Sequence, residues 1–222
     1  AEGGIDRRNA ARRNHIALGA SIGAVFGITR TGAIVCARGV VKRPDRALVL
    51  CAGFGQRMHP LTCDTPKPLM PLWGVPNLTH ILTTLQAWGI RDVLLNLHHV
   101  PDPLLQYARA CPLPGMRIDL SFEADILGTG GALQNAKWFM RNDPIWVVNA
   151  DILMDLKPTP MLRALDHPRT IASVWVDDRS GPRTVECPGG RVKTFRSAHA
   201  GRDGTYTFCG VQIVQPELLQ YL

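Results

Sequence analysis

The sequence lacks the features that mark a membrane protein, a disulfide-stabilised protein or a disordered chain. Its 222 residues contain no apolar run of about 18 residues, so no membrane-spanning helix is expected. The six cysteines are scattered through apolar stretches without close metal-ligand spacing, which is typical of reduced cysteines and predicts a cytoplasmic protein. Charged residues are 19% and hydrophobic residues 45% of the chain, enough for one sizeable core and a small additional module.

Positive charge is concentrated near the N-terminus. Residues 1–45 hold eight Lys and Arg against three acids, whereas residues 46–222 hold 17 against 15. A nucleic-acid surface would interleave aromatic residues with the basic ones, and the basic run from Arg7 to Arg13 has no aromatic residue nearby. We therefore expect a solvated charged face and no nucleic-acid partner.

Residues 16–40 contain a repeat of six residues, with small residues between the aliphatic ones. The aliphatic positions are Ile16, Ile22, Ile28, Ile34 and Val40. This spacing fits a hexapeptide β-solenoid and resembles the last coils of a left-handed β-helix. The alternative is an accidental spacing in an apolar segment rich in Gly and Ala. Because so few coils cannot stand alone, residues 1–45 are interpreted as the end of an upstream solenoid, and the sequence as a fragment.

From residue 46 onward, buried strands alternate with helices. Strands are predicted at 47–51, 93–97, 118–122, 145–149, 170–176, 185–186, 192–195 and 206–214, and helices at 77–88, 102–110, 130–140 and 160–165. Short connections between them favour an α/β, Rossmann-like, open and mostly parallel sheet with helices on both faces. Ligands bind at the carboxyl ends of the strands in such sheets.

A glycine-rich loop follows the first of these strands. Gly53 and Gly55 allow backbone amides to approach phosphate oxygens closely. Met58 stands where a dinucleotide fingerprint requires glycine, and the Gly-Lys-Ser/Thr of a Walker A loop is absent. A rigid loop carrying Arg57 and Lys67 suits a pyrophosphate group. The prolines that stiffen it are Pro60, Pro66, Pro68, Pro71 and Pro76.

Residues 53–76 closely resemble the sugar-1-phosphate nucleotidyltransferase family. That family carries Gly-x-Gly-x-Arg-[Met/Leu]-x-Pro-Leu-Thr, then Pro-Lys-Pro and a Gly-x-Pro before a helix, and all three occur here in matching order and spacing. The resemblance extends over residues 46–222. Among the branches of the family, the chain looks most like the bacterial mannose-1-phosphate guanylyltransferase-like and N-acetylmuramate-1-phosphate uridylyltransferase-like proteins.

The resemblance implies a fold and a reaction. The fold is that of the nucleotide-diphospho-sugar transferases. The reaction condenses a sugar 1-phosphate with a nucleoside triphosphate, with Mg²⁺, to give an NDP-sugar and pyrophosphate. Arg57 and Lys67 are then the catalytic cations, on the β/γ-phosphates and on the α-phosphate or sugar phosphate respectively. The nucleotide-binding loop contains Ala52, Gly53, Gly55 and Gln56.

Residues 123–133 join a strand to a helix through three glycines. The resemblance places Glu123 and Gly128 near the nucleobase and Thr129 beside the nucleoside and sugar. A carboxylate at a strand end can accept hydrogen bonds from base N–H groups. A guanine N–H would suit Glu123, which favours GTP slightly over UTP. The alternative is a solvent-exposed Glu beside an ordinary glycine turn.

Three further segments carry candidate residues. Asn149-Ala150-Asp151 resembles the family's Asn-Gly-Asp, which implies that Asp151 binds Mg²⁺ and that Asn149 lies near the sugar. An Mg²⁺ ion needs only one or two protein carboxylates; the alternative is a turn or helix N-cap role for Asp151. Phe208-Cys209-Gly210 resembles the family's Phe-x-Gly strand, so Gly210 is expected to approach the sugar. The segment Asn96 to His99 resembles an Asn-x-His-His of the family, with His99 either lining the nucleotide pocket or packing structurally.

Two other functions remain compatible with these residues. One is a non-catalytic, nucleotide-sugar-binding regulatory subunit of the same fold, and the other a bifunctional protein with an upstream hexapeptide acyltransferase. The family's second metal-binding Asp is expected beyond Leu222, so a C-terminally truncated domain would bind nucleotide yet turn over poorly. Assembly into a homo-oligomer stays open.

Overall fold

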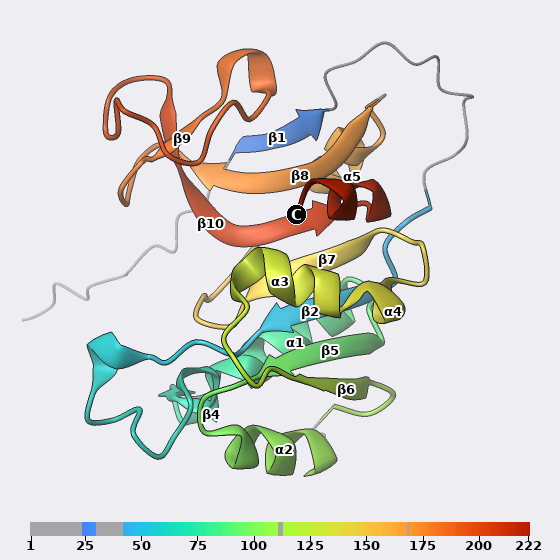
Figure 1. Cartoon of the computed structure of the whole chain (residues 1–222), viewed down its shortest axis with the longest axis vertical. Coiled ribbons are helices and arrows are strands. Elements are labelled where there is room, and N and C mark those ends of the chain that lie inside the picture. The colour runs from blue at the N-terminus through green and yellow to red at the C-terminus, as the bar shows by residue number, and fades with distance from the viewer. Residues whose placement is uncertain (1–23, 30–41, 111–112, 168) are drawn as a thin grey trace, which may run out of the picture.

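The computed structural model describes residues 24–29, 42–110, 113–167 and 169–222 (Figure 1). Its main sheet has eight strands within these ranges, in the order β1-β8-β10-β7-β2-β5-β6, with β9 paired to β10 outside this path. The strands are β1 (Ala24–Thr29), β2 (Arg46–Leu50), β5 (Asp92–Leu97), β6 (Arg117–Phe122), β7 (Ile145–Asn149), β8 (Thr170–Asp177), β9 (Val185–Glu186) and β10 (Thr205–Val214). A separate small hairpin consists of β3 (Pro71–Leu72) and β4 (Val75–Pro76).

Five α-helices and four short 3-10 turns accompany the sheet in the described ranges. The helices are α1 (Asn77–Ala87), α2 (Pro101–Ala110), α3 (Gly128–Asn135), α4 (Lys137–Met140) and α5 (Thr159–Leu165). The turns are η1 (Gln56–Met58), η2 (Lys67–Leu69), η3 (Pro188–Gly190) and η4 (Pro216–Tyr221). No helix of the described segments has the length and apolar character needed to cross a lipid bilayer.

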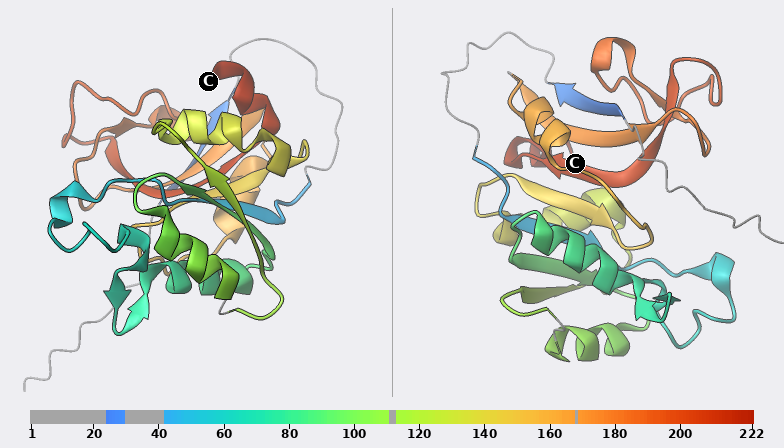
Figure 2. Two further views of the ribbon diagram at one scale, coloured as in Figure 1. Left: turned by 60° about the horizontal axis from the view of Figure 1, so that its bottom comes forward. Right: turned by 180° about the vertical axis from the view of Figure 1, so that it is seen from behind.

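The central strands bury both faces, as continuous apolar runs predict. In β2, Val49 belongs to the apolar cluster shared with α1, where Leu82 is fully buried. Leu48, the next residue along the strand, belongs to the opposite cluster, which contains Leu133 of α3 and Phe139 of α4. The two views in Figure 2 show α1 on one side of the sheet and α3 on the other. The predicted open sheet with helices on both faces is confirmed.

Strand direction divides the sheet into two halves. The strands β7, β2, β5 and β6 are mutually parallel, and this half matches the sequence prediction. β10 is antiparallel to both β7 and β8, and β1 is antiparallel to β8. Only the parallel half has several carboxyl ends side by side at one edge, which is where a ligand site is expected.

Two predicted elements differ from the structure. The helix predicted at 130–140 begins at Gly128 and is divided at Ala136 into α3 and α4. The strand predicted at 192–195 does not form, and a single bridge joins Thr194 to Glu186. Because β9 consists of only two residues, it is too short to pair with the whole of segment 192–195.

Ala24–Thr29 forms an edge strand of the main sheet rather than a coil of a solenoid. It pairs with β8 from Ala24 opposite Val176 to Thr29 opposite Thr170, with an irregularity after Ile28. The open edge of β8 explains this arrangement, because its unpaired N–H and C=O groups accept another strand. The other four repeat positions lie outside the described residues, and a domain boundary after residue 45 stays a prediction.

Candidate functional site

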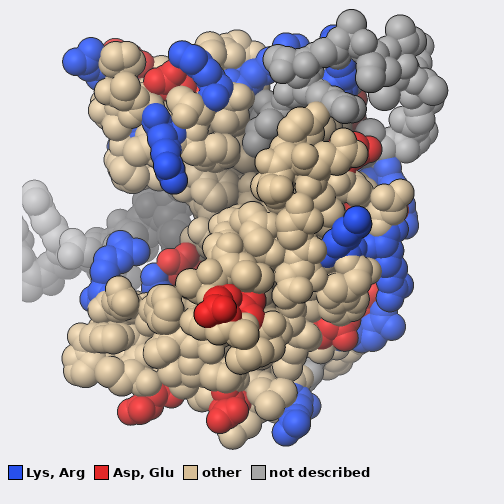
Figure 3. Space-filling model, in the orientation of Figure 1, with Lys and Arg blue, Asp and Glu red and all other residues tan. Residues whose placement is uncertain are grey.

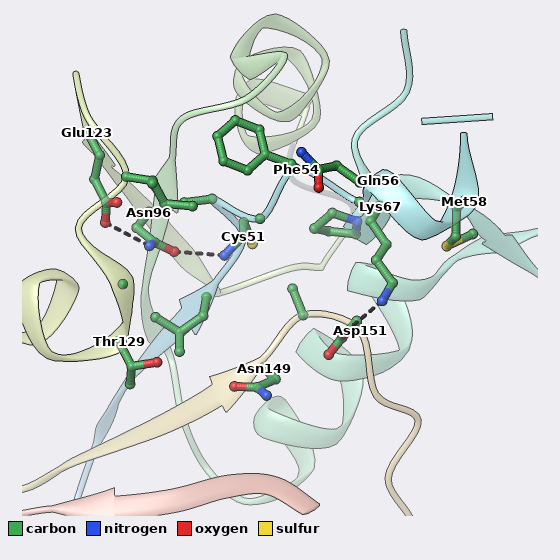
Figure 4. Close-up of a pocket in the computed structure, with 18 of the residues that line it drawn as sticks. Cys51, Phe54, Gln56, Met58, Lys67, Asn96, Glu123, Thr129, Asn149 and Asp151 are labelled. Atoms are coloured by element: carbon green, nitrogen blue, oxygen red, sulfur yellow. Dashed lines mark hydrogen bonds and ion pairs between the residues drawn. The ribbon is translucent and has the colours of Figure 1, made fainter. Parts of the chain in front are cut away.

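A pocket of about 470 Å³ opens at the carboxyl ends of β2, β5 and β7 (Figure 4). This is the size of a small-molecule site, at the sheet edge where such sites form. Eleven of the twelve residues predicted for the site line it. They are Ala52, Gly53, Gly55, Gln56, Arg57, Lys67, Glu123, Gly128, Thr129, Asn149 and Asp151.

The glycine loop owes its shape to a buried threonine. Gly55 has a φ of 64°, and a Cβ added there would lie 3.1 Å from the Thr62 side chain. Thr62 is fully buried, and its hydroxyl donates to the Gly55 carbonyl at 2.9 Å. The Met58 N–H donates to the same carbonyl, also at 2.9 Å. The Thr of the Pro-Leu-Thr motif therefore closes the loop that presents Arg57 to the pocket.

Lys67 and Asp151 form an ion pair at the pocket wall. Lys67 Nζ lies 2.7 Å from Asp151 Oδ2, and the two side chains are 27% and 38% exposed. Lys67 begins η2, whereas Asp151 follows β7 by two residues. The sequence predicted a phosphate contact for one and a metal for the other. The structure brings the two groups into direct contact, and both line the pocket (Figure 4).

Gly210 is the predicted site residue that does not line the pocket. It has a φ of 78°, and a Cβ added there would meet Asn149 Cβ and Nδ2 at 3.1 Å each. Ile152 Cγ2 would also lie 3.1 Å away. Gly210 therefore lies directly behind Asn149, which does line the pocket. Its approach to a sugar stays a prediction.

Hydrogen bonds connect three strand ends beneath the pocket. The Cys51 N–H donates to Asn96 Oδ1 at 2.7 Å, and Asn96 Nδ2 donates to Glu123 Oε1 at 2.8 Å. The Leu127 N–H donates to Glu123 Oε2 at 3.0 Å. We call these three bonds the strand-end network. Glu123, expected near the base, thus has both oxygens engaged within the protein, and the base contact stays a prediction.

Several pocket residues were not singled out as site residues by sequence. Asn96 was noted only within its Asn-x-His-His segment, although its place at a strand end is a usable signal. Cys51 also lines the pocket, but burial raises the pKa of its thiol far above the usual range, so it stays a neutral group. Gly128, in contrast, has no atom within 4 Å of an added Cβ, which leaves open space beside it.

Phe54 adds an aromatic group to the pocket wall. Its ring is 37% exposed and meets His98 edge-on, with 5.2 Å between ring centroids, and His99 at 5.6 Å. His98 Nδ1 lies 2.9 Å from the Glu123 carbonyl, and His99 Nε2 lies 3.4 Å from the Thr62 carbonyl. The two histidines therefore pack against Phe54, and His99, whose role stayed open, does so without lining the pocket.

The sequence profile of a family described as nucleotidyl transferase matches residues 46–184. The chain belongs to this family. Three curated relatives are mannose-1-phosphate guanylyltransferases. The Mycobacterium tuberculosis protein is 39% identical over 48% of this chain and 30% of its own length. The Xenopus tropicalis catalytic subunit beta is 32% identical over 68% and 44%, and a probable Arabidopsis thaliana enzyme is 30% identical over 78% and 51%.

The chain thus spans about half or less of the length of these relatives. Solved structures share the family's fold. HddC from Yersinia pseudotuberculosis complexed with GMP-PN aligns with a TM-score of 0.64 and 20% identity, over 80% of this chain and 79% of that one. UDP-glucose pyrophosphorylase from Acinetobacter baumannii aligns with a TM-score of 0.64 and 16% identity, over 81% and 77%.

The family site offers few ligands for a metal. Among the described residues, no group of three or more His, Cys, Asp or Glu side chains is arranged to hold a metal ion. Asp151, however, presents a partly exposed carboxylate to the pocket. Mg²⁺ commonly takes one or two carboxylates and completes its coordination with waters and substrate phosphates. A single partly exposed oxygen ligand at the pocket wall therefore fits Mg²⁺ better than a metal that needs a full set of protein ligands.

Proposed function

We propose that this chain is the nucleotide-binding part of a sugar-1-phosphate nucleotidyltransferase. The proposal rests on one observation. The glycine loop that resembles the family motif, two cationic side chains and a carboxylate all line the same pocket. Arg57, Lys67 and Asp151 all line it, although Asp151 is 84 residues beyond Lys67. A non-catalytic sensor of the same fold would have no need to keep all three.

The proposed reaction is an in-line displacement at phosphorus. A phosphate oxygen of the sugar 1-phosphate attacks the α-phosphorus of the nucleoside triphosphate. The bond from the α-phosphorus to the bridging oxygen breaks, and pyrophosphate leaves. The attacking oxygen is already anionic at neutral pH, so no general base is required. Catalysis then comes from positioning the two substrates and from neutralising charge.

Each charged side chain has a part in that neutralisation. Arg57 presents a forked donor to the β- and γ-phosphates, and Lys67 a point charge to the α-phosphate or the sugar phosphate. Asp151 would hold Mg²⁺, which neutralises phosphate charge when bound. Binding of phosphates would separate Lys67 from Asp151, because both partners of that pair then have new counter-ions.

We further propose GTP as the nucleotide and mannose 1-phosphate as the sugar substrate. The support is that the curated relatives carry the name mannose-1-phosphate guanylyltransferase. The expected contact between Glu123 and guanine gives little added support, because both carboxylate oxygens already accept hydrogen bonds. A cytoplasmic location belongs to the same proposal, since nucleoside triphosphates are made and used there.

A thermal-shift screen of GTP, UTP, ATP and dTTP with Mg²⁺ tests the nucleotide. A ligand at 100 times its Kd stabilises the folded state by about 2.7 kcal/mol. GTP is expected to give the largest shift. Pyrophosphate release is then followed with GTP and mannose 1-phosphate together, and with each alone as a control. Release only when both are present would separate condensation from simple hydrolysis.

Two outcomes would contradict the proposal. If none of the four nucleotides shifts the melting temperature, the pocket is not a nucleotide site. If a nucleotide binds but no sugar 1-phosphate of a panel gives pyrophosphate, the enzymatic assignment fails, and a nucleotide-binding regulatory subunit is the better description.

A further inference from the structure

The strand-end network connects two segments that Figure 4 shows on opposite sides of the pocket. Cys51, at one end of the network, directly precedes the glycine loop of residues 52–57. Leu127, at the other end, directly precedes Gly128 and Thr129, the first residues of α3. Two side chains from neighbouring strand ends lie between them. Asn96 and Glu123 therefore set the position of the glycine loop relative to the start of α3.

Every donor in the network faces an acceptor, which fixes the orientation of the Asn96 amide. The Cys51 N–H can only donate, so Asn96 must turn its oxygen toward it and its NH₂ toward Glu123. The Leu127 N–H also donates to Glu123. Both Glu123 oxygens therefore act as acceptors in the network. Asn96 is 4% and Glu123 2% exposed, so water cannot readily replace a lost partner.

We propose that Asn96 and Glu123 are positioning residues for nucleotide binding. They hold the glycine loop of residues 52–57 at a fixed distance from the N-terminus of α3. This distance is the one that a bound nucleoside triphosphate has to bridge. The inference rests on the proposed function, because a nucleotide is the ligand that bridges the two segments. It gives Glu123 a role that acts through Asn96 and the backbone rather than through direct contact with the base.

Single substitutions break the matching of donors and acceptors. Glu123→Gln replaces one acceptor oxygen by a donor NH₂ group. Whichever way the amide groups at positions 96 and 123 are oriented, one N–H group of the network then points at another N–H group. Asn96→Asp makes the opposite error, because two carboxylates then face each other. Each variant is expected to weaken nucleotide binding by about tenfold or more, the scale of one lost hydrogen bond to a charged group.

The double variant Asn96→Asp/Glu123→Gln restores the matching. The new carboxylate at position 96 accepts from the Cys51 N–H and from the new amide at position 123. The oxygen of that amide accepts from the Leu127 N–H. The number of hydrogen bonds and the net charge are those of the wild type. The double variant should therefore bind nucleotide better than either single variant, which no additive loss of stability would produce.

The test measures the Kd for GTP with Mg²⁺ by calorimetry on the full chain, together with the melting temperature of each variant. The double variant is expected to return to within about threefold of the wild-type Kd. Asp177→Asn is the matched control. Asp177 is 8% exposed and accepts from the backbone N–H groups of Arg179 and Ser180, but it does not line the pocket. Its loss should lower the melting temperature and leave the Kd unchanged.

The outcomes separate this inference from the proposed function. A wild-type chain that binds none of the four nucleotides contradicts the proposed function itself; if another of the four binds best, that nucleotide is the probe. Wild-type binding together with an unchanged Kd for Glu123→Gln overturns the inference alone. If the single variants do not fold, the double variant decides. Its failure to fold, or to bind once folded, overturns the inference, because matched donors and acceptors should suffice.

Discussion

Lys67 Nζ lies 2.7 Å from Asp151 Oδ2, which joins two segments that are 84 residues apart in the sequence. Both side chains are partly exposed, so the pair contributes little to the stability of the fold. The carboxylate and the ammonium group neutralise each other at the wall of the pocket. A polyanionic ligand and its cation would each find a partner in this pair.

Replacing either member should therefore damage turnover much more than folding. We expect Lys67→Ala and Asp151→Asn each to reduce pyrophosphate release by on the order of 10²-fold or more, because each removes charge stabilisation at the reacting phosphates. The melting temperatures should change little, since exposed ion pairs contribute about 0–1 kcal/mol. Steady-state kinetics and thermal unfolding of the same samples check both expectations.

Lys42→Ala provides the matched control for this pair. Lys42 Nζ lies 2.6 Å from Asp143 Oδ2, so it is also half of a Lys–Asp pair, but it does not line the pocket. Its removal should leave turnover near the wild-type value. Near-wild-type turnover of Lys67→Ala and Asp151→Asn would show that the pair has no part in the chemistry.

The parallel half of the sheet and most of the pocket lining were predictable from sequence, for a local reason. An apolar run such as residues 47–51 is buried on both faces, and the polar or glycine residue that follows marks a strand end. Because parallel strands have their carboxyl ends at one edge of the sheet, Asp151 and Gly53 were expected at the same edge. The family resemblance selected the residues at these strand ends, and eleven of the twelve it implied line the pocket.

The pairings inside the site were not predictable, because they depend on which strands are neighbours. β2 lies between β5 and β7, and this order brings Asn96 to Cys51 across 45 residues of sequence. No local pattern encodes that contact, or the one between Lys67 and Asp151. The pairing of Ala24–Thr29 with β8 was not predictable for a related reason, because a short apolar segment fits a solenoid coil and a sheet edge equally well.

Gly210→Ala tests whether the residue behind Asn149 shapes the pocket. Gly210 and Gly204 have φ values of 78° and 79°, so an added Cβ carries the same backbone strain at both, about 1–2 kcal/mol. Only at Gly210 would that Cβ press on Asn149, at 3.1 Å; Gly204 has nothing within 4 Å. We expect both variants to lose stability and Gly210→Ala alone to lose about tenfold in turnover. Chemical denaturation and steady-state kinetics compare them, and equal turnover of the two variants would mean that Asn149 can move without consequence.

The pH dependence of stability should reflect Asp143. Its hydrogen bond from Lys42 holds the pKa of this carboxyl below its ordinary value; burial opposes the shift, and Arg46 adds a second hydrogen bond. A lowered folded-state pKa means that the stabilisation is complete above the unfolded-state pKa of about 3.9 and is lost as pH falls through the folded-state pKa. Asp143→Asn should therefore be less stable than the wild type at pH 7, by about 1–3 kcal/mol, because the buried Arg46 then faces a neutral amide in place of a charged carboxylate.

That difference should shrink as pH falls below about 4, where the wild-type carboxyl also loses its charge. Denaturation curves of the two proteins between pH 3 and pH 7 measure it. Asp166→Asn is the control, since Asp166 pairs with Arg43 through side chains that are 43% and 55% exposed, and such a pair contributes little at any pH. A constant gap between wild type and Asp143→Asn across this range would mean that the loss comes from altered packing, and that the charge of Asp143 is not what stabilises the fold.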